Sequence, residues 1–138
     1  MTPWIIDASL AMNWYLTDEQ DRQYSVSVFT ALGQREILVP SLWIYEIANV
    51  LLVAQRRGRI PPERIQYALE TVADLNLRID EIVPESALRL SRLALQHGLT
   101  VYDAAYLDLA LRSCAPIATK DKALLKAMES ANVHLVNP

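Results

Sequence analysis

Four acidic residues occupy positions in the sequence that a parallel α/β fold would place at its ligand-binding edge. Asp7 directly follows the short apolar segment 4–6, and Asp121 follows a second such segment. Glu46 and Asp103 lie in the first turns of two expected helices. In such folds, ligands bind beyond the carboxyl ends of the strands, and the helices of β-α units begin at the same edge. We therefore expect these four carboxylates at one edge of a sheet.

Carboxylates at one edge repel one another, which raises their pKa values unless a cation neutralises them. Mg²⁺ prefers oxygen ligands and binds through a few carboxylates, waters and substrate phosphates. Such an ion polarises a phosphoryl oxygen and lowers the pKa of a bound water, which can then attack as hydroxide. The acids therefore indicate a Mg²⁺ or Mn²⁺ site that acts on a phosphate-bearing substrate.

Taken singly, each acid also fits a structural role. Asp121 is typical of an N-cap for the helix that follows it, and Asp7 fits the same role at the first helix. Thr100 and Asp103 form an approximate capping box. Glu46 complements the dipole of its helix. Capping is therefore the alternative explanation for each acid alone, whereas the metal site explains the set.

Three polar neighbours are candidates to support the acids. Ser9 and Thr119 each lie two residues from one of the acids, where a hydroxyl can hydrogen-bond a carboxylate, a water or a phosphate. They are equally typical of turn or cap residues. Asn49 lies three residues after Glu46, where it either orients that carboxylate, contacts a substrate or faces solvent.

The elements that must position these residues alternate between strands and helices. Apolar segments predict strands over residues 4–6, 37–39, 78–83, 117–118 and 133–136. Periodicity, glycines and prolines predict helices over 9–16, 19–32, 41–57, 62–75, 85–96, 101–113 and 122–130. This alternation predicts a parallel sheet of four to five strands with helices on both faces, in a single domain over residues 1–138.

Composition excludes several classes of protein. The chain has 138 residues, of which 52% are hydrophobic, which argues against intrinsic disorder. The single Cys114 excludes a disulfide scaffold, and three glycines exclude a glycine-rich phosphate loop. A net charge of −3 argues against general polyanion binding. We find neither a signal peptide nor an apolar run of the roughly 18 residues that span a bilayer, so a cytoplasmic protein is expected.

The expected helix over residues 41–57 is apolar on nearly all sides. A surface helix needs only one apolar stripe, the one that faces the core. This helix is therefore either sandwiched within the core or offers a second face to a partner, such as another copy of the chain.

The segments around the acids resemble the motifs of the PIN domain family. Residues 5–9 (Ile-Ile-Asp-Ala-Ser) are similar to its opening motif, and residues 40–51 are similar to its second. Residues 100–107 and 117–124 resemble the third and the fourth. Four motifs in the family's order, spread over nearly the whole chain, form a specific signal where one alone is weak.

The resemblance implies a three-layer α/β/α sandwich and a Mg²⁺- or Mn²⁺-dependent endoribonuclease. Small single-domain members of this size are mostly VapC-type toxins, paired with a VapB-type antitoxin protein and commonly homodimeric. On this resemblance Ser9 and Thr119 support the acids. The metal-binding, catalytic residues would be Asp7, Glu46, Asp103 and Asp121.

The resemblance also bears on the partners. Antitoxins of this family place a basic side chain in the acidic pocket, where it is attracted to the carboxylates. They also use apolar surface on the early helices, for which Trp14, Tyr15 and Leu16 are candidates; core packing is the alternative. Asp108, five residues after Asp103, matches no motif and is interpreted as exposed helix surface.

An RNA substrate must approach a chain of net negative charge. Mg²⁺ ions would offset part of the pocket's charge. Arg56, Arg57 and Arg59 lie beyond the helix that carries Glu46, where they either bind phosphates or complement the helix C-terminus.

Two other functions compete with the ribonuclease. A receiver-like signalling domain has a similar length and an acidic Mg²⁺ pocket, but it needs paired acids after the first strand and an aspartate after a middle strand. The sequence has only Asp7 at the first place and no aspartate after residues 37–40. A catalytically inactive RNA- or protein-binding module on the same scaffold is the other alternative, against which the presence of all four acids argues.

Overall fold

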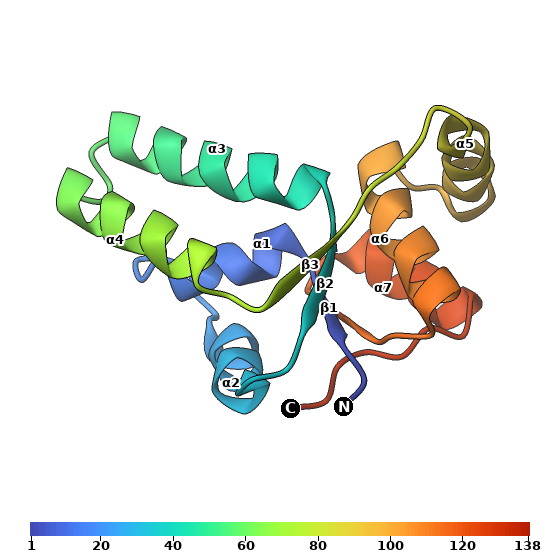
Figure 1. Ribbon diagram of the computed structural model, residues 1–138, viewed down its shortest axis with the longest axis horizontal. Helices are drawn as coiled ribbons and strands as arrows, with labels where there is room; N and C mark the ends of the chain where they lie inside the picture. Colours follow the sequence, from blue (N-terminus) through green and yellow to red (C-terminus); the bar gives the residue numbers. More distant parts are fainter.

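A computed structural model describes residues 1–138 as a parallel sheet between two layers of helices (Figure 1). The strands are β1 (Trp4–Ile6), β2 (Ile37–Pro40), β3 (Leu77–Asp80) and β4 (Ile117–Ala118). The helices are α1 (Ala8–Ala11), the 3₁₀ helix η1 (Met12–Trp14), α2 (Gln23–Leu32), α3 (Leu42–Arg56), α4 (Pro62–Ala73), α5 (Ser86–His97), α6 (Val101–Ser113) and α7 (Lys122–Ser130). Figure 1 shows α1 to α4 on one side of the sheet and α5 to α7 on the other. The predicted three-layer α/β/α architecture is confirmed.

The strand order creates a natural site at one edge of the sheet. The order is β3-β2-β1-β4, and all three pairings are parallel. The chain runs outward from β1 through β2 to β3, then returns past β1 to form β4. Open α/β sheets bind ligands beyond the carboxyl ends of the strands where this direction reverses. In this sheet the reversal lies between β1 and β4, the strands that precede Asp7 and Asp121.

The central elements are apolar because helices cover them on both sides. β1, β2 and β4 are buried along their whole length, as strands covered on two faces must be. In α6 every residue from Ala104 to Ala110 is buried. This helix packs against α5, α7 and β2, so it has no broad solvent face in its middle.

Several predicted boundaries are wrong. The helix expected over 19–32 begins only at Gln23, and Asp21 just before it has a positive φ of 55° that a helix does not allow. The segment 9–16 divides into α1 and η1. The strand expected over 78–83 ends at Asp80. The strand expected over 133–136 is reduced to one parallel bridge between Ile117 and Leu135.

The structure shows which sides of the apolar helix α3 are covered by the rest of the chain. Trp43, Ile47 and Leu51 are buried on one side of it. Ile44, Tyr45 and Leu52 remain exposed on the other, and Tyr45 is 78% exposed. The helix thus has a core face and an uncovered apolar face.

No helix of the chain is both long enough and apolar enough to span a membrane.

Candidate functional site

Asp7 lies at the carboxyl end of β1 and is held by two hydroxyls. Its side chain is buried and caps the N-terminus of α1 through a 3.3 Å contact from the Ser9 amide. Its Oδ2 accepts hydrogen bonds of 2.8 Å from both Ser9 Oγ and Thr119 Oγ1. These bonds compensate the loss of water around a buried carboxylate. Both predicted supporting hydroxyls therefore contact an acid.

Thr119 also connects Asp7 to Asp121. Its Oγ1 accepts a 3.1 Å hydrogen bond from the Asp121 amide while it donates to Asp7. Asp121 itself is exposed and caps α7, because its Oδ1 accepts a 2.8 Å hydrogen bond from the Leu124 amide. The capping interpretation of Asp121 is therefore correct, and Thr119 links the backbone of Asp121 to the carboxylate of Asp7 at the same time.

Glu46 and Asp103 approach this pair from α3 and α6. Burial raises the pKa of Glu46, and repulsion from Asp7 and Asp103 raises it as well. A hydrogen bond from Tyr106 acts in the opposite direction. Asp103 is partly buried, and Thr100 accepts a hydrogen bond from its backbone amide as the helix N-cap.

The pKa of Asp103 is raised by two other acids of the set. Burial raises it first, and repulsion from Asp121 and Asp7 raises it further. No lysine or arginine forms an ion pair with any of the four carboxylates, whereas the ion-paired acids elsewhere in the chain all have arginine partners. The four acids thus form a negatively charged cluster in which no carboxylate is ion-paired.

The four carboxylates are suitable ligands for a hard divalent cation, but they lie too far apart to share one ion. The ligands are carboxylate oxygens, the type that Mg²⁺ and Mn²⁺ prefer. No three His, Cys, Asp or Glu side chains converge closely enough to hold one ion. The acids are therefore near enough to repel one another but not drawn together, and their side chains must move closer to share a cation.

Tyr106 is the site residue that the sequence analysis missed. Its hydroxyl donates a 2.9 Å hydrogen bond to Glu46 Oε1 and accepts a 3.3 Å hydrogen bond from the Ala8 amide. The only signal in the sequence is its place three residues after Asp103, on a neighbouring position of the same helix. A tyrosine in an apolar helix is otherwise typical of a core residue.

The predicted contact between Asn49 and Glu46 is not formed, and Arg59, a predicted RNA contact, is ion-paired within the chain. Asn49 is exposed and makes no hydrogen bond to Glu46, which is oriented by Tyr106 instead. Arg59 is engaged with Asp18 and Glu19 at 2.9–3.0 Å, which ties the loop after η1 to the end of α3. Arg56 and Arg57 are exposed and form no ion pair.

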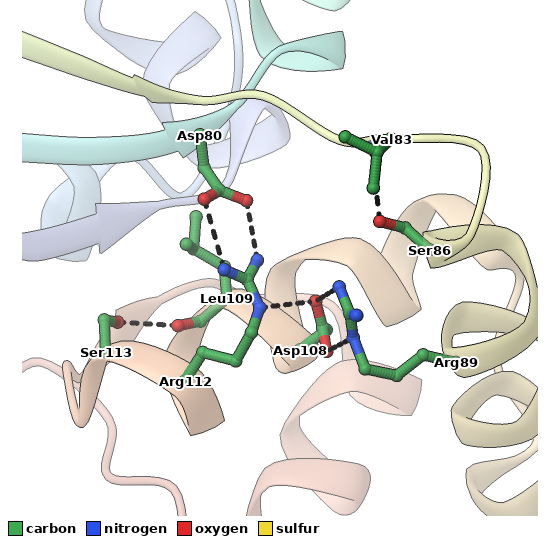
Figure 2. A network of polar contacts seen from close by, with 8 residues as sticks. All are labelled: Asp80, Val83, Ser86, Arg89, Asp108, Leu109, Arg112 and Ser113. Atoms are coloured by element: carbon green, nitrogen blue, oxygen red, sulfur yellow. Dashed lines mark hydrogen bonds and ion pairs between the residues drawn. The ribbon is translucent and has the colours of Figure 1, made fainter.

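The interpretation of Asp108 as helix surface is wrong. The residue is only 4% exposed, because α5 covers this side of α6. Figure 2 shows its carboxylate between the guanidinium groups of Arg89 and Arg112, at 2.8 and 2.9 Å. Arg112 also contacts Asp80 of β3. Asp108 therefore belongs to an ion-pair network that joins α5, α6 and the edge of the sheet, apart from the acidic cluster.

An apolar groove is lined by residues of η1, α2 and α4 and of the segments that flank them. Its volume is about 410 Å³. Trp14 and Tyr15, which the sequence suggested as partner-contacting residues, line this groove, whereas Leu16 is buried in the core. The other lining residues are Arg22, Val26, Phe29, Tyr67, Thr71, Asp74 and Leu75.

Comparisons with known proteins identify chains that are similar to this one in sequence and in fold. The chain is 31% identical over 121 residues to Ribonuclease VapC3 of Pyrobaculum aerophilum, and the match covers 87% of this chain and 90% of that protein. The crystal structure of PAE2754 from Pyrobaculum aerophilum has a TM-score of 0.63 at 24% identity, over 91% of this chain and 79% of the other. The crystal structure of FitAcB from Neisseria gonorrhoeae has a TM-score of 0.68 at 14% identity, over 98% and 97%. These two structural matches support the fold.

The sequence profile of the PIN domain matches residues 4–129, a range that begins with β1 and includes all four acids. The four segments that resemble the family's motifs lie within this range, and the order of the strands places them at one edge of the sheet. The chain therefore belongs to the PIN domain family.

Proposed function

We propose that this protein is a metal-dependent endoribonuclease and the toxin of a toxin–antitoxin pair. The proposal rests mainly on one observation. Four carboxylates from separate segments lie near enough to repel one another where the strand order reverses, and none of them is ion-paired. The similarity to Ribonuclease VapC3 supports RNA as the substrate.

Asp7, Glu46, Asp103 and Asp121 would hold Mg²⁺ or Mn²⁺ as the catalytic residues. A bound divalent cation would polarise the phosphodiester and lower the pKa of an attacking water. Within the chain, Ser9 and Thr119 fix the orientation of the Asp7 carboxylate. Thr100 and the N-cap geometry of α6 fix the backbone that carries Asp103.

Removal of divalent cations tests the activity. Wild-type protein should cleave RNA in the presence of Mn²⁺ or Mg²⁺ and lose this activity in excess EDTA, because no cation would then polarise the phosphodiester or lower the pKa of the attacking water. Restoring Mn²⁺ should restore cleavage. Product ends mapped by sequencing would identify the sites. Cleavage that persists unchanged in EDTA would contradict the proposal.

RNA binding would use positive charge outside the acidic cluster. Arg56 and Arg57 are exposed and free of ion pairs at the end of α3, the helix that carries Glu46. They suit contacts to phosphates, which position RNA without reading its sequence. Arg59 is a weaker candidate because Asp18 and Glu19 already engage it. Asn49 is exposed on the same helix and is available to RNA.

A VapB-type antitoxin would bind in the groove at Trp14 and Tyr15. Aromatic side chains in a concave apolar surface are typical of protein interfaces. The uncovered face of α3 would serve a homodimer, since its exposed residues Ile44, Tyr45 and Leu52 have no partner within the chain. The cytoplasm stays the expected compartment.

Replacement of Tyr67 tests the antitoxin groove. Tyr67 lines the groove and is 69% exposed, so Tyr67→Glu should leave the fold intact. A charge on the apolar wall should weaken antitoxin binding at least tenfold, about 1.4 kcal/mol. The ligand would be the protein encoded directly upstream, and binding would be measured by calorimetry. Leu95→Glu, at a residue 86% exposed on α5, is the matched control. Equal affinities of the two variants would argue against this groove.

A further inference from the structure

Tyr106 connects three elements that each carry an acid of the cluster. Its side chain is 1% exposed, and its ring packs in the hydrophobic core. The hydroxyl reaches Glu46 on α3 and the amide of Ala8, the residue after Asp7. Tyr106 itself lies one helical turn after Asp103 on α6. One hydroxyl therefore joins the segments of three acids that are distant in sequence.

The contacts fix the direction of the hydroxyl proton. A backbone amide can only donate, so the hydrogen bond from Ala8 occupies a lone pair of the Tyr106 oxygen. The single hydroxyl proton then points to Glu46 Oε1, 2.9 Å away. Ala8 is the first residue of α1, and its amide has no acceptor within that helix. The tyrosine thus satisfies a free helix-terminal donor and orients a carboxylate at the same time.

The remaining oxygen of Glu46 is left without a protein partner. No hydrogen bond or ion pair to Glu46 Oε2 occurs in the structure, and the carboxylate is half-buried. A carboxylate held through one oxygen keeps the other available for a cation. Groups that orient metal ligands in this way typically change metal affinity or activity by about 10- to 100-fold when they are removed.

We propose that Tyr106 is a positioning residue that orients Glu46 for divalent cation binding. This inference rests on the proposed metal-dependent function. It assigns Tyr106 no contact with RNA or with the reacting atoms, because its hydroxyl is already engaged on both sides.

Tyr106→Phe tests the inference because it retains the buried ring and removes only the hydroxyl. The dissociation constant for Mn²⁺, measured by calorimetry without RNA, should rise about tenfold or more. In cleavage assays, the Mn²⁺ concentration for half-maximal activity should rise to the same extent, while KM for RNA at saturating Mn²⁺ stays unchanged. Loss of core packing alone would not move the Mn²⁺ affinity in this way.

Tyr24→Phe is the matched control. Tyr24 is half-buried, and its hydroxyl donates a 2.7 Å hydrogen bond to the Val136 carbonyl, outside the acidic cluster. Each variant loses a buried phenol hydroxyl, so the two should show comparable losses in melting temperature. Only Tyr106→Phe should lose Mn²⁺ affinity.

The outcomes separate this inference from the proposed function. Equal Mn²⁺ affinity in the Tyr106→Phe and Tyr24→Phe variants, with wild-type protein that binds Mn²⁺ and cleaves RNA, would overturn the inference alone. Wild-type protein that binds no Mn²⁺ would overturn the metal site and the inference together.

Discussion

Asp103→Asn should reduce RNA cleavage at least 100-fold, which corresponds to about 2.7 kcal/mol of lost transition-state stabilisation. The amide keeps the size of the side chain but lacks the charge that a divalent cation requires. Asp103 forms no ion pair, and in the cap of α6 it contacts Thr100 alone, chiefly through its backbone amide, so the fold should tolerate the loss of its charge.

The stability of the same variant distinguishes a catalytic from a structural role. Burial and repulsion from neighbouring acids raise the pKa of Asp103 above its ordinary value of 3.8. An acid with a raised pKa in the folded state destabilises that state once it ionises. Without added metal at neutral pH, Asp103→Asn should therefore melt at the same temperature as wild type or higher. The difference should vanish as the pH falls below 3.8, where the acid is protonated in both the folded and the unfolded state.

A structural role gives the opposite pattern. If Asp103 were only a cap, the variant would lose stability at neutral pH and keep its cleavage activity. Asp74→Asn is a suitable control, because Asp74 is an exposed acid that lies outside the acidic cluster at the end of α4. It should leave both the cleavage rate and the melting temperature close to those of wild type.

Asp108→Ala should produce the largest loss of stability, about 3 kcal/mol. Asp108 is buried and pairs with two arginines, and removal of one member of a buried ion pair typically costs 3–5 kcal/mol. The lower end applies because Arg89 and Arg112 are partly exposed and regain water. For a chain of this length the melting temperature should fall by about 10 °C.

The matched control for Asp108 is Asp80→Ala. Asp80 pairs with the same Arg112, but nearer the surface, where ion pairs contribute about 1 kcal/mol or less. Figure 2 shows the two acids on either side of the Arg112 guanidinium. Equal losses of stability in the two variants would contradict the view that burial gives Asp108 its importance.

The sequence predicts the elements best where a cap or a turn marks their ends. Helices 101–113 and 122–130 have the predicted bounds, since Thr100 and Asp121 provide N-caps that a short motif reveals. The segment 133–136 has the same apolar character as a strand, but pairing depends on a neighbour that local sequence does not encode. It therefore forms one bridge and no strand.

The site could be predicted as a set of acids but not as a geometry. Strand ends and helix starts locate Asp7, Glu46, Asp103 and Asp121, because these positions share one edge of any parallel sheet. Contacts between residues that are far apart in the sequence leave no recognisable pattern in the local sequence. The Tyr106 bridge to Glu46 and Ala8 and the burial of Asp108 under α5 both depend on how helices pack. The spacing of the acids depends on the same packing and on the bound ion.

The central claim is that the four acids share a divalent cation, and a crystal grown with Mn²⁺ tests it most directly. Anomalous scattering at the manganese absorption edge locates the ion independently of any assumed ligand. We expect a peak within coordination distance of at least two of the carboxylates of Asp7, Glu46 and Asp103, with these three side chains closer together than in the free protein. An anomalous map without a peak there at saturating Mn²⁺, with the acids still apart, would contradict it.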